Sequence, residues 1–248
     1  IAFNYQATLA AYRGDTASGL AWIDKARALH DQVSPLDKVR IANTDAFLQY
    51  LIGDVSRARQ AYEQALTLAR HIEHDYLMLD AHAYLAQVDL MAGELQAVQD
   101  RCEAVLKQYQ SEISPVSTVM LPLASVQYQR NQRVAAETTL RNAIALAQLG
   151  NIRDVLWLAH LSLAEVLLTR GEIDEARACF QKARSDSKGF HSPMMASFIA
   201  ATEARLMLRS GQSEAAFAWA DQNQTLEPTG YQQDYKMLTL ARIWLVRQ

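Results

Sequence analysis

A helical unit that recurs at nearly constant spacing is the feature that most limits what this chain can fold into. Glycine, and after it asparagine, adopts without a steric clash the positive φ that ends a helix. Such turn residues recur with steps of 39, 40, 38, 40 and 40 residues, at Gly14, Gly53, Gly93, Asn131, Gly171 and Gly211. Self-similarity at this period indicates stacked units that each contact mainly their neighbours.

The residues around each turn repeat in size as well as in spacing. After the Gly53-Asp54 turn, small Ala58, bulky Tyr62 and small Ala65 fall on one helical face. In all six copies the position seven residues before the turn is alanine, at Ala7, Ala46, Ala86, Ala124, Ala164 and Ala204. Small residues let a neighbouring helix approach closely, so we predict that Tyr62 and its counterpart Phe180 fill the space between helices.

This pattern predicts an all-α fold, a right-handed superhelix of helix pairs whose first helices line the concave side. The period is longer than the roughly 34 residues of tetratricopeptide repeats and touches the lower edge of the HEAT and armadillo range. The small, bulky, small series after a Gly-Asp turn favours the tetratricopeptide type. We place about six pairs in a single domain, at residues 1–35, 36–74, 75–114, 115–151, 152–192 and 193–229, with a terminal helix at 230–248. Joints between pairs are expected at residues 33–35, 71–75, 111–115, 149–151, 189–193 and 227–230.

Pro122 departs from the pattern, because it falls inside the predicted first helix of the fourth pair. Proline removes one helical hydrogen bond and clashes with the preceding turn, so we expect a local bend in the wall. Ordinary variation between repeats and a functional kink both explain it.

Composition and the lack of catalytic motifs argue against several classes of function. The 24 basic and 27 acidic residues are interspersed and give a net charge of −3, so nothing favours direct binding of nucleic acid. No apolar run is long enough to span a membrane. Phosphate-loop, zinc-protease and serine-hydrolase motifs are also missing. We therefore expect a cytoplasmic protein that is not an enzyme, with no catalytic residues, no metal site and no cofactor in this stretch.

The candidate binding surface is the groove formed by the first helices. Tyrosine and amide groups concentrate in the first four of these helices, and charged groups in the last three. Tyrosine presents a flat apolar face with a polar tip, which suits sugars, aromatic small molecules or peptides. The same residues are equally compatible with ordinary half-exposed helix surface. The candidates are Asn4, Tyr5, Asn43, Phe47, Tyr50, Tyr84, Gln87, Ser125, Tyr128, Glu165, Arg205 and Arg242.

The last repeat resembles a known family. The Ala-Trp-Ala run at 218–220, a proline-containing joint and the Leu-Ala-Arg-Ile-Trp-Leu run at 240–245 are similar to the sensor region of MalT-like activators. The period of 39 to 40 residues resembles that region too. These activators are ATP-dependent transcription regulators with a LuxR-type helix-turn-helix. The resemblance implies a nucleotide-binding domain before this segment and a DNA-binding domain after it. The chain starts without a methionine and ends in an apolar helix, so we interpret it as a fragment in which Trp244 and Leu245 need a cover.

Two functions from different classes follow from these patterns. The first is a sensor domain that binds a small-molecule inducer or a regulatory protein and contacts other domains of the same chain. The alternative is a tetratricopeptide-repeat scaffold that assembles proteins by capturing a peptide in the groove. Self-association stays open in both cases, and the resemblance does not specify the ligand, because the family has no single inducer.

Overall fold

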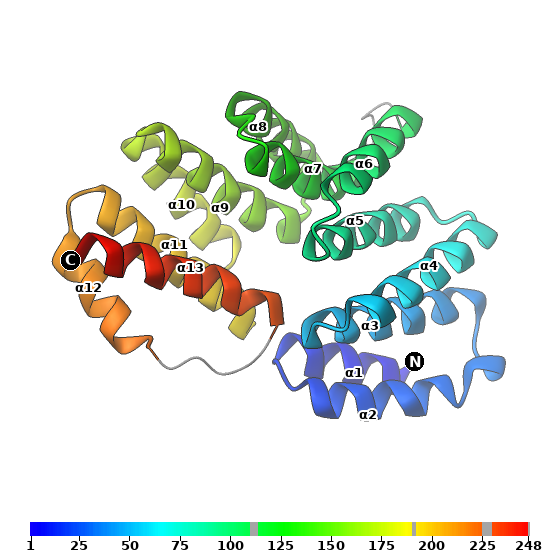
Figure 1. Ribbon diagram of the computed structural model, residues 1–248. Coiled ribbons are helices and arrows are strands. Elements are labelled where there is room, and N and C mark those ends of the chain that lie inside the picture. The colour runs from blue at the N-terminus through cyan, green and yellow to red at the C-terminus, as the bar shows by residue number, and fades with distance from the viewer. Residues whose placement is uncertain (110–113, 190–191, 225–229, 248) are drawn as a thin grey trace.

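The computed structural model describes residues 1–109, 114–189, 192–224 and 230–247, which form thirteen α-helices, two short 3-10 turns and no strand (Figure 1). This confirms the predicted all-α fold of stacked helix pairs with a terminal helix. The 3-10 turns are His30–Gln32 and Ser114–Val116. The helices are α1 (Ala2–Tyr12), α2 (Thr16–Arg27), α3 (Pro35–Ile52), α4 (Val55–His71), α5 (Asp75–Met91), α6 (Leu95–Tyr109), α7 (Ser117–Gln129), α8 (Arg133–Leu149), α9 (Arg153–Arg170), α10 (Ile173–Asp186), α11 (Pro193–Arg209), α12 (Ser213–Gln222) and α13 (Gly230–Arg247).

All six predicted turn residues take a positive φ, from 61° at Asn131 to 83° at Gly171. In the second pair, Asp54 follows the turn and accepts a hydrogen bond from the Arg57 amide at 3.0 Å. This contact caps α4, because it satisfies one of the amides that have no partner in the first helical turn. The turn therefore reverses the chain between the two helices of a pair.

Two prolines that the sequence analysis placed in joints between pairs are the first residues of helices in the structure. Pro35 and Pro193 open α3 and α11, because the first helical turn does not use the amide that proline lacks. Ser34 caps α3 by accepting a hydrogen bond from the Asp37 amide at 3.2 Å. Parts of three predicted joints, at 110–113, 190–191 and 225–229, lie outside the described residues.

Pro122 is buried inside α7, which continues through it as one helix. Its missing amide leaves the Thr118 carbonyl without the usual donor four residues on. The helix is thus continuous at this point, and a functional kink at the proline stays a prediction.

The first helix of each pair lies on the inside of the curve. Each odd-numbered helix contacts the next odd-numbered one, from α1 to α13, while the even-numbered helices spread apart on the outside (Figure 1). Burial agrees with this arrangement, since α9 buries residues around its whole circumference and α10 buries a single stripe. The odd-numbered helices therefore form the concave wall.

The core follows the repeat. The six alanines that precede the turns by seven residues are at most 2% exposed, which allows adjacent inner helices to pack closely. Tyr62 and Phe180 are each 1% exposed, as the size pattern predicts. The second and fifth repeats thus bury one bulky side chain between small ones.

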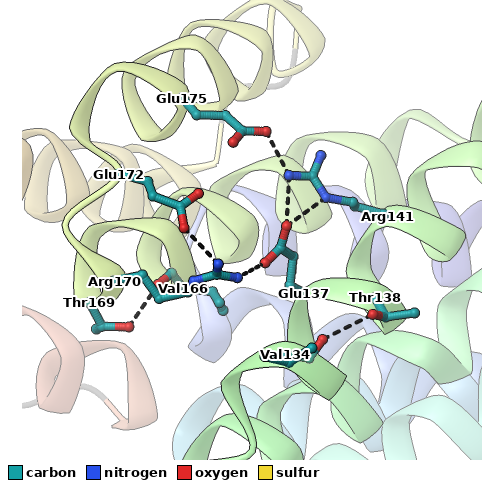
Figure 2. Close-up of polar contacts among 9 residues, drawn as sticks. All are labelled: Val134, Glu137, Thr138, Arg141, Val166, Thr169, Arg170, Glu172 and Glu175. Atoms are coloured by element: carbon teal, nitrogen blue, oxygen red, sulfur yellow. Dashed lines mark hydrogen bonds and ion pairs between the residues drawn. The ribbon is translucent and has the colours of Figure 1, made fainter.

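Ion pairs add a polar connection between the fourth and fifth pairs. Glu137 on α8 contacts both Arg141 and Arg170, and these arginines also contact Glu175 and Glu172 (Figure 2). Most of these side chains are a third or more exposed, so water screens the pairs and each adds little stability. The network helps to set how α8, α9 and α10 align.

The superhelix closes on itself, which the repeat pattern does not predict. Met194 at the start of α11 packs against the core of the first pairs. A Cβ atom added at Gly14 would lie 3.6 Å from Cγ of Pro193. α13 also contacts α3, and its start lies beside the blue N-terminal helices (Figure 1). The first and last pairs therefore bound the concave side together.

Apolar side chains remain exposed on α13. Leu245 is 71% exposed and Trp244 39%, and a cover for these residues stays a prediction. Among the described residues, no helix combines the length and the apolar character that crossing a membrane requires.

We predict that Phe180→Ala lowers the free energy of unfolding by about 3–5 kcal/mol, because it leaves a cavity between packed helices. Urea denaturation followed by circular dichroism measures the change. The control is Val134→Ala, at a position 70% exposed on α8, which should change the value by less than about 0.5 kcal/mol. A loss below about 1 kcal/mol for Phe180→Ala would show that the repeat pattern does not define the core.

Candidate ligand-binding site on the concave face

Five aromatic residues from α1, α3, α4 and α5 form one continuous cluster, which we call the aromatic cluster. Ring centroids are 5.7 Å apart for Tyr12 and Phe47, 5.8 Å for Phe47 and Tyr84, and 5.1 Å for Tyr84 and Tyr62. Tyr50 completes the cluster at 6.4 Å from both Phe47 and Tyr84. The cluster runs from Tyr12, 43% exposed, to Tyr62, 1% exposed, and so connects solvent with the core.

The repeat explains part of this arrangement. Phe47 and Tyr50 lie three residues apart on α3 and therefore share a face. α5 contacts α3 and places Tyr84 against both rings. Three of the predicted groove residues are thus brought together, while Tyr62 reaches them from its buried position on α4.

Two carboxyl groups accompany the aromatic cluster. Tyr76, Asp80 and Tyr84 follow at four-residue intervals on α5 and share one face. Burial disfavours the charged form of Asp80, and the nearby carboxylate of Asp154 adds repulsion; together they raise the pKa of Asp80 to about 7. Asp154 is an exposed residue in the first turn of α9, where partial desolvation raises its pKa and the charge of neighbouring Arg153 lowers it. The fifth pair therefore presents a carboxyl group to residues of the third.

The end of α1 faces the same carboxyl groups. Burial first, then the charges of Asp154 and Asp80, raise the pKa of Tyr12 to about 12. Tyr76 is 46% exposed, and burial and the same two charges raise its pKa as well. A side chain that water reaches, but whose charged form is still poorly solvated, has protein on several sides. Tyr12 and Tyr76 therefore share the electrostatic environment of Asp80 and Asp154.

Several buried polar atoms on α1, α3 and α4 have no hydrogen-bond partner among the described residues. They are Oη of Tyr62, Oδ1 of Asn43, Oδ1 of Asn4 and Oε1 of Gln49. A buried polar group left unpaired costs about 1–3 kcal/mol, so such atoms ordinarily bind ordered water or a ligand. The first two pairs thus have unused capacity for hydrogen bonds.

Asn4 and Tyr5 line a separate hollow between α1 and α3. Its volume is about 170 Å³, and the other lining residues are Ile1, Thr8, Asp37, Arg40 and Ile41. Ligand pockets usually span about 300–1,000 Å³. This hollow is too small to hold more than part of a ligand.

The charged residues predicted for the later repeats belong to a buried polar network. Arg205 on α11 donates to Oε2 of Glu165 at 2.6 Å and to Oγ1 of Thr239 at 2.8 Å. The Tyr235 hydroxyl donates to Oε1 of Glu165 at 2.6 Å and lies 2.8 Å from Oγ1 of Thr202. The guanidinium of Arg205 also stacks 4.1 Å from the centre of the Tyr235 ring. Glu165 and Arg205 therefore connect α9, α11 and α13, and a role of theirs in ligand binding stays a prediction.

The remaining predicted residues are distributed along the wall. Ser125 donates its hydroxyl to the Leu121 carbonyl at 3.1 Å, within its own helix. Tyr128 is half-buried, and burial followed by the charge of Glu165 raises its pKa. Arg242 lowers that pKa, so Tyr128 and Arg242 lie near the buried network. Gln87 is half-buried on α5.

Sequence reasoning does not include Tyr76, Asp80 or Asp154 among the groove residues. Asp80 carries a usable signal, because it stands one helical turn before Tyr84 on the same face. No sequence pattern points to Asp154, since its position near Tyr12 depends on the curvature of the whole superhelix.

Comparison with known proteins agrees with the fold and the repeat pattern. The fold and its concave wall define a helical-repeat interaction domain. The sequence model of the MalT-like TPR region matches residues 5–248, and the chain belongs to this family of tetratricopeptide-repeat regions. A comparison with curated protein sequences finds no match.

Solved structures share the fold at low sequence identity. Aspartyl phosphate phosphatase F from Bacillus subtilis is 18% identical with a TM-score of 0.60, over 83% of this chain and 54% of that one. This chain thus spans about half the length of the phosphatase. BtubC from P. vanneervenii is 20% identical with a TM-score of 0.59, over 90% and 89% of the two chains. A Rap protein complexed with Competence and Sporulation Factor is 12% identical with a TM-score of 0.67, over 99% and 73%.

We predict that Glu165→Ala destabilises the protein by about 3 kcal/mol, because it leaves the charge of Arg205 buried without its partner. Arg205 is 8% exposed. Arg242→Ala, at an exposed position on α13, is the matched control and should leave urea denaturation nearly unchanged. Equal effects of the two substitutions would contradict a buried, stabilising network.

We predict that Asp80→Asn stabilises the protein at pH 8 and has little effect at pH 4. The pKa of Asp80 rises from its ordinary value of 3.8 to about 7 on folding, so the folded state binds more protons than the unfolded state between these values. The stability contributed by protonated Asp80 is complete below pH 3.8 and is lost as the pH rises through 7. Water reaches this carboxyl group and screens its charge. We therefore expect Asp80→Asn to raise the free energy of unfolding at pH 8 by about 1–3 kcal/mol. Urea denaturation at the two pH values measures it, and a loss of stability at pH 8 would contradict the assignment.

Proposed function

We propose that this chain is the sensor domain of a MalT-like transcription regulator and that it binds its inducer, or a regulatory protein, at the aromatic cluster. The observation that carries the proposal is the continuity of the cluster from exposed Tyr12 to buried Tyr62, whose hydroxyl lacks a partner among the described residues. Exposed aromatic faces beside unpaired polar atoms supply both the affinity and the orientation that ligand binding needs. Membership of the family supports the regulatory context.

The closed superhelix offers a way to transmit binding. A ligand on the aromatic cluster contacts α1, α3 and α5, and α1 and α3 take part in the closure against α11 and α13. A ligand changes a conformational equilibrium only when it binds one arrangement more tightly than another. We propose that occupancy favours one closure geometry and that the other domains of the regulator sense it.

The remaining parts of the regulator lie outside this chain in our proposal. We assign to them an ATP-dependent switch domain and a LuxR-type DNA-binding domain, and we place the whole regulator in the cytoplasm. This segment then needs no cofactor, no catalytic residue and no direct contact with nucleic acid or membrane. Its exposed apolar residues on α13 are a surface for the neighbouring domains or for self-association.

A scaffold that captures a peptide in the groove is the second candidate. One observation favours it: a protein of the same fold, Rap, has been solved in complex with Competence and Sporulation Factor. The two candidates differ in what binding does, because a sensor transmits the binding event to the other domains of its chain, whereas a scaffold only holds a peptide partner in the groove.

Calorimetry on ligands selected by thermal-shift screening of metabolites and peptides tests the proposal. We expect Tyr12→Ala and Phe47→Ala to weaken binding at least about tenfold, which corresponds to about 1.4 kcal/mol of lost contact. Tyr5→Ala, a tyrosine 69% exposed beside the separate hollow, is the matched control and should change the affinity less than about twofold. If every ligand bound both cluster variants as tightly as the unaltered chain, the site would be elsewhere.

A further inference from the structure

We propose that the hollow between α1 and α3 is a second binding site, which takes one aromatic ring that carries a hydroxyl group, a phenol. The hollow is separate from the aromatic cluster, since none of the five cluster rings is among the residues that line it. The inference therefore goes beyond the proposed function and does not depend on it.

The first support is the size of the hollow. Its volume is about 170 Å³. A protein cavity of about 150 Å³ with apolar walls holds a benzene molecule. The hollow between the two inner helices thus has room for one six-membered ring, while the rest of a larger ligand stays outside.

The second support is the nature of the walls. Ile41 on α3 is 4% exposed, while Ile1 and Tyr5 on the other side of the hollow are 77% and 69% exposed. The two isoleucines offer apolar contact, and the exposed ring of Tyr5 is available to a ligand ring. Contacts between two aromatic rings are favourable beyond the apolar area that they bury. An aromatic ring therefore suits these walls better than an open chain.

The third support is the balance of charge around the hollow. Arg40 and Asp37 both line it, and Nη1 of Arg40 lies 3.4 Å from Oδ1 of Asp37. Asp37 also accepts a hydrogen bond from the Ser34 hydroxyl at 2.7 Å. Because the two opposite charges offset each other, the side chains around the hollow have no net charge. A neutral ring should therefore bind better than a charged one.

The fourth support is an unpaired hydrogen-bonding atom. Thr8 uses its hydroxyl within the wall, since it donates to the Asn4 carbonyl at 3.0 Å and lies 3.1 Å from Oγ1 of Thr44. Oδ1 of Asn4, by contrast, is buried and has no partner among the described residues. A phenol hydroxyl donates to such an oxygen, and it also accepts from Nδ2 of the same amide. The Asn4 side chain therefore selects a ring with a hydroxyl group.

NMR titration of the chain with p-cresol tests the inference, with toluene as the matched compound that lacks the hydroxyl. Because p-cresol is small, we expect a dissociation constant on the order of 1 mM, with shifts in the signals of Thr8 and Ile41. Toluene should bind about tenfold more weakly, because it leaves Oδ1 of Asn4 unpaired. The charged compound 4-methylbenzoate should also bind more weakly than p-cresol.

Asn4→Leu is the decisive variant, because leucine has a similar shape and no hydrogen-bonding atom in its side chain. It should lower the affinity for p-cresol about tenfold and remove the preference over toluene. Asn142→Leu, at an exposed position on α8, is the matched control and should keep the affinity within about twofold. Tyr5→Ala should weaken the binding of both compounds, because both lose the same ring contact. Circular dichroism of each variant verifies that its helices are formed.

A second arm identifies the source of the phenol. The peptides acetyl-Gly-Tyr-Gly-amide and acetyl-Gly-Phe-Gly-amide present the same ring with and without the hydroxyl. If the tyrosine peptide binds more tightly than p-cresol, the ligand is a tyrosine side chain of a partner. If p-cresol binds more tightly, the ligand is a free phenol. Both results support the site, provided that the phenylalanine peptide binds more weakly than the tyrosine peptide.

Three results would overturn the inference. They are equal binding of p-cresol and toluene, shifts that appear at the aromatic cluster instead of the hollow or not at all, and a preference for p-cresol that survives Asn4→Leu. Tyr12→Ala and Phe47→Ala test the aromatic cluster, which lies outside the hollow. Failure of one site therefore leaves the other unaffected.

Discussion

Close packing between successive inner helices is the constraint on which the rest of this structure depends. An alanine in each first helix, at most 2% exposed, lets adjacent inner helices approach while the outer helices spread apart. That difference in spacing is what curves the stack. The curvature brings α11 and α13 back to α1 and α3, so contacts between neighbours produce a contact between the ends.

The two halves of the concave wall use their polar groups in different ways. Glu165, Arg205 and Tyr235 satisfy one another and hold the last three inner helices in place. In the first half, the Tyr62 hydroxyl lacks a partner among the described residues and Asp80 has a pKa raised to about 7. An unpaired buried hydroxyl and a buried carboxyl group both lower the stability of a fold, and proteins commonly have such groups where they bind a ligand. The contrast is why we place the site on the first half of the wall and regard the second half as its support.

The sequence predicts the elements of this fold far better than it predicts the site. The spacing of turns and the size pattern are local properties, so they locate the helices and the buried positions of Tyr62 and Phe180. The repeat register also places Phe47 and Tyr84 on neighbouring inner helices. Glu165 and Arg205 stand six residues before Gly171 and Gly211, so their pairing could have been foreseen from the same register. The sequence does not predict the approach of Asp154 to Tyr12. This approach depends on small rotations that accumulate over four repeats, and no local sequence pattern reflects the accumulated rotation.

The closure between the first and sixth pairs is the claim on which the proposed transmission of binding depends most directly. Disulfide trapping in the double variant Gly14→Cys, Pro193→Cys measures it, because positions 14 and 193 are neighbours only if the superhelix is closed. Gly14 has a φ of +78°, where a cysteine is strained, so circular dichroism first verifies that the variant is folded. The native Cys102 and Cys179 are buried, and burial raises both of their pKa values, so the unaltered chain should show no disulfide under the same mild oxidation. We predict rapid formation of an intramolecular disulfide at low protein concentration, visible as a shift in non-reducing electrophoresis. Free thiols at both positions after prolonged oxidation of the folded variant would contradict the closed superhelix and the transmission of binding that depends on it.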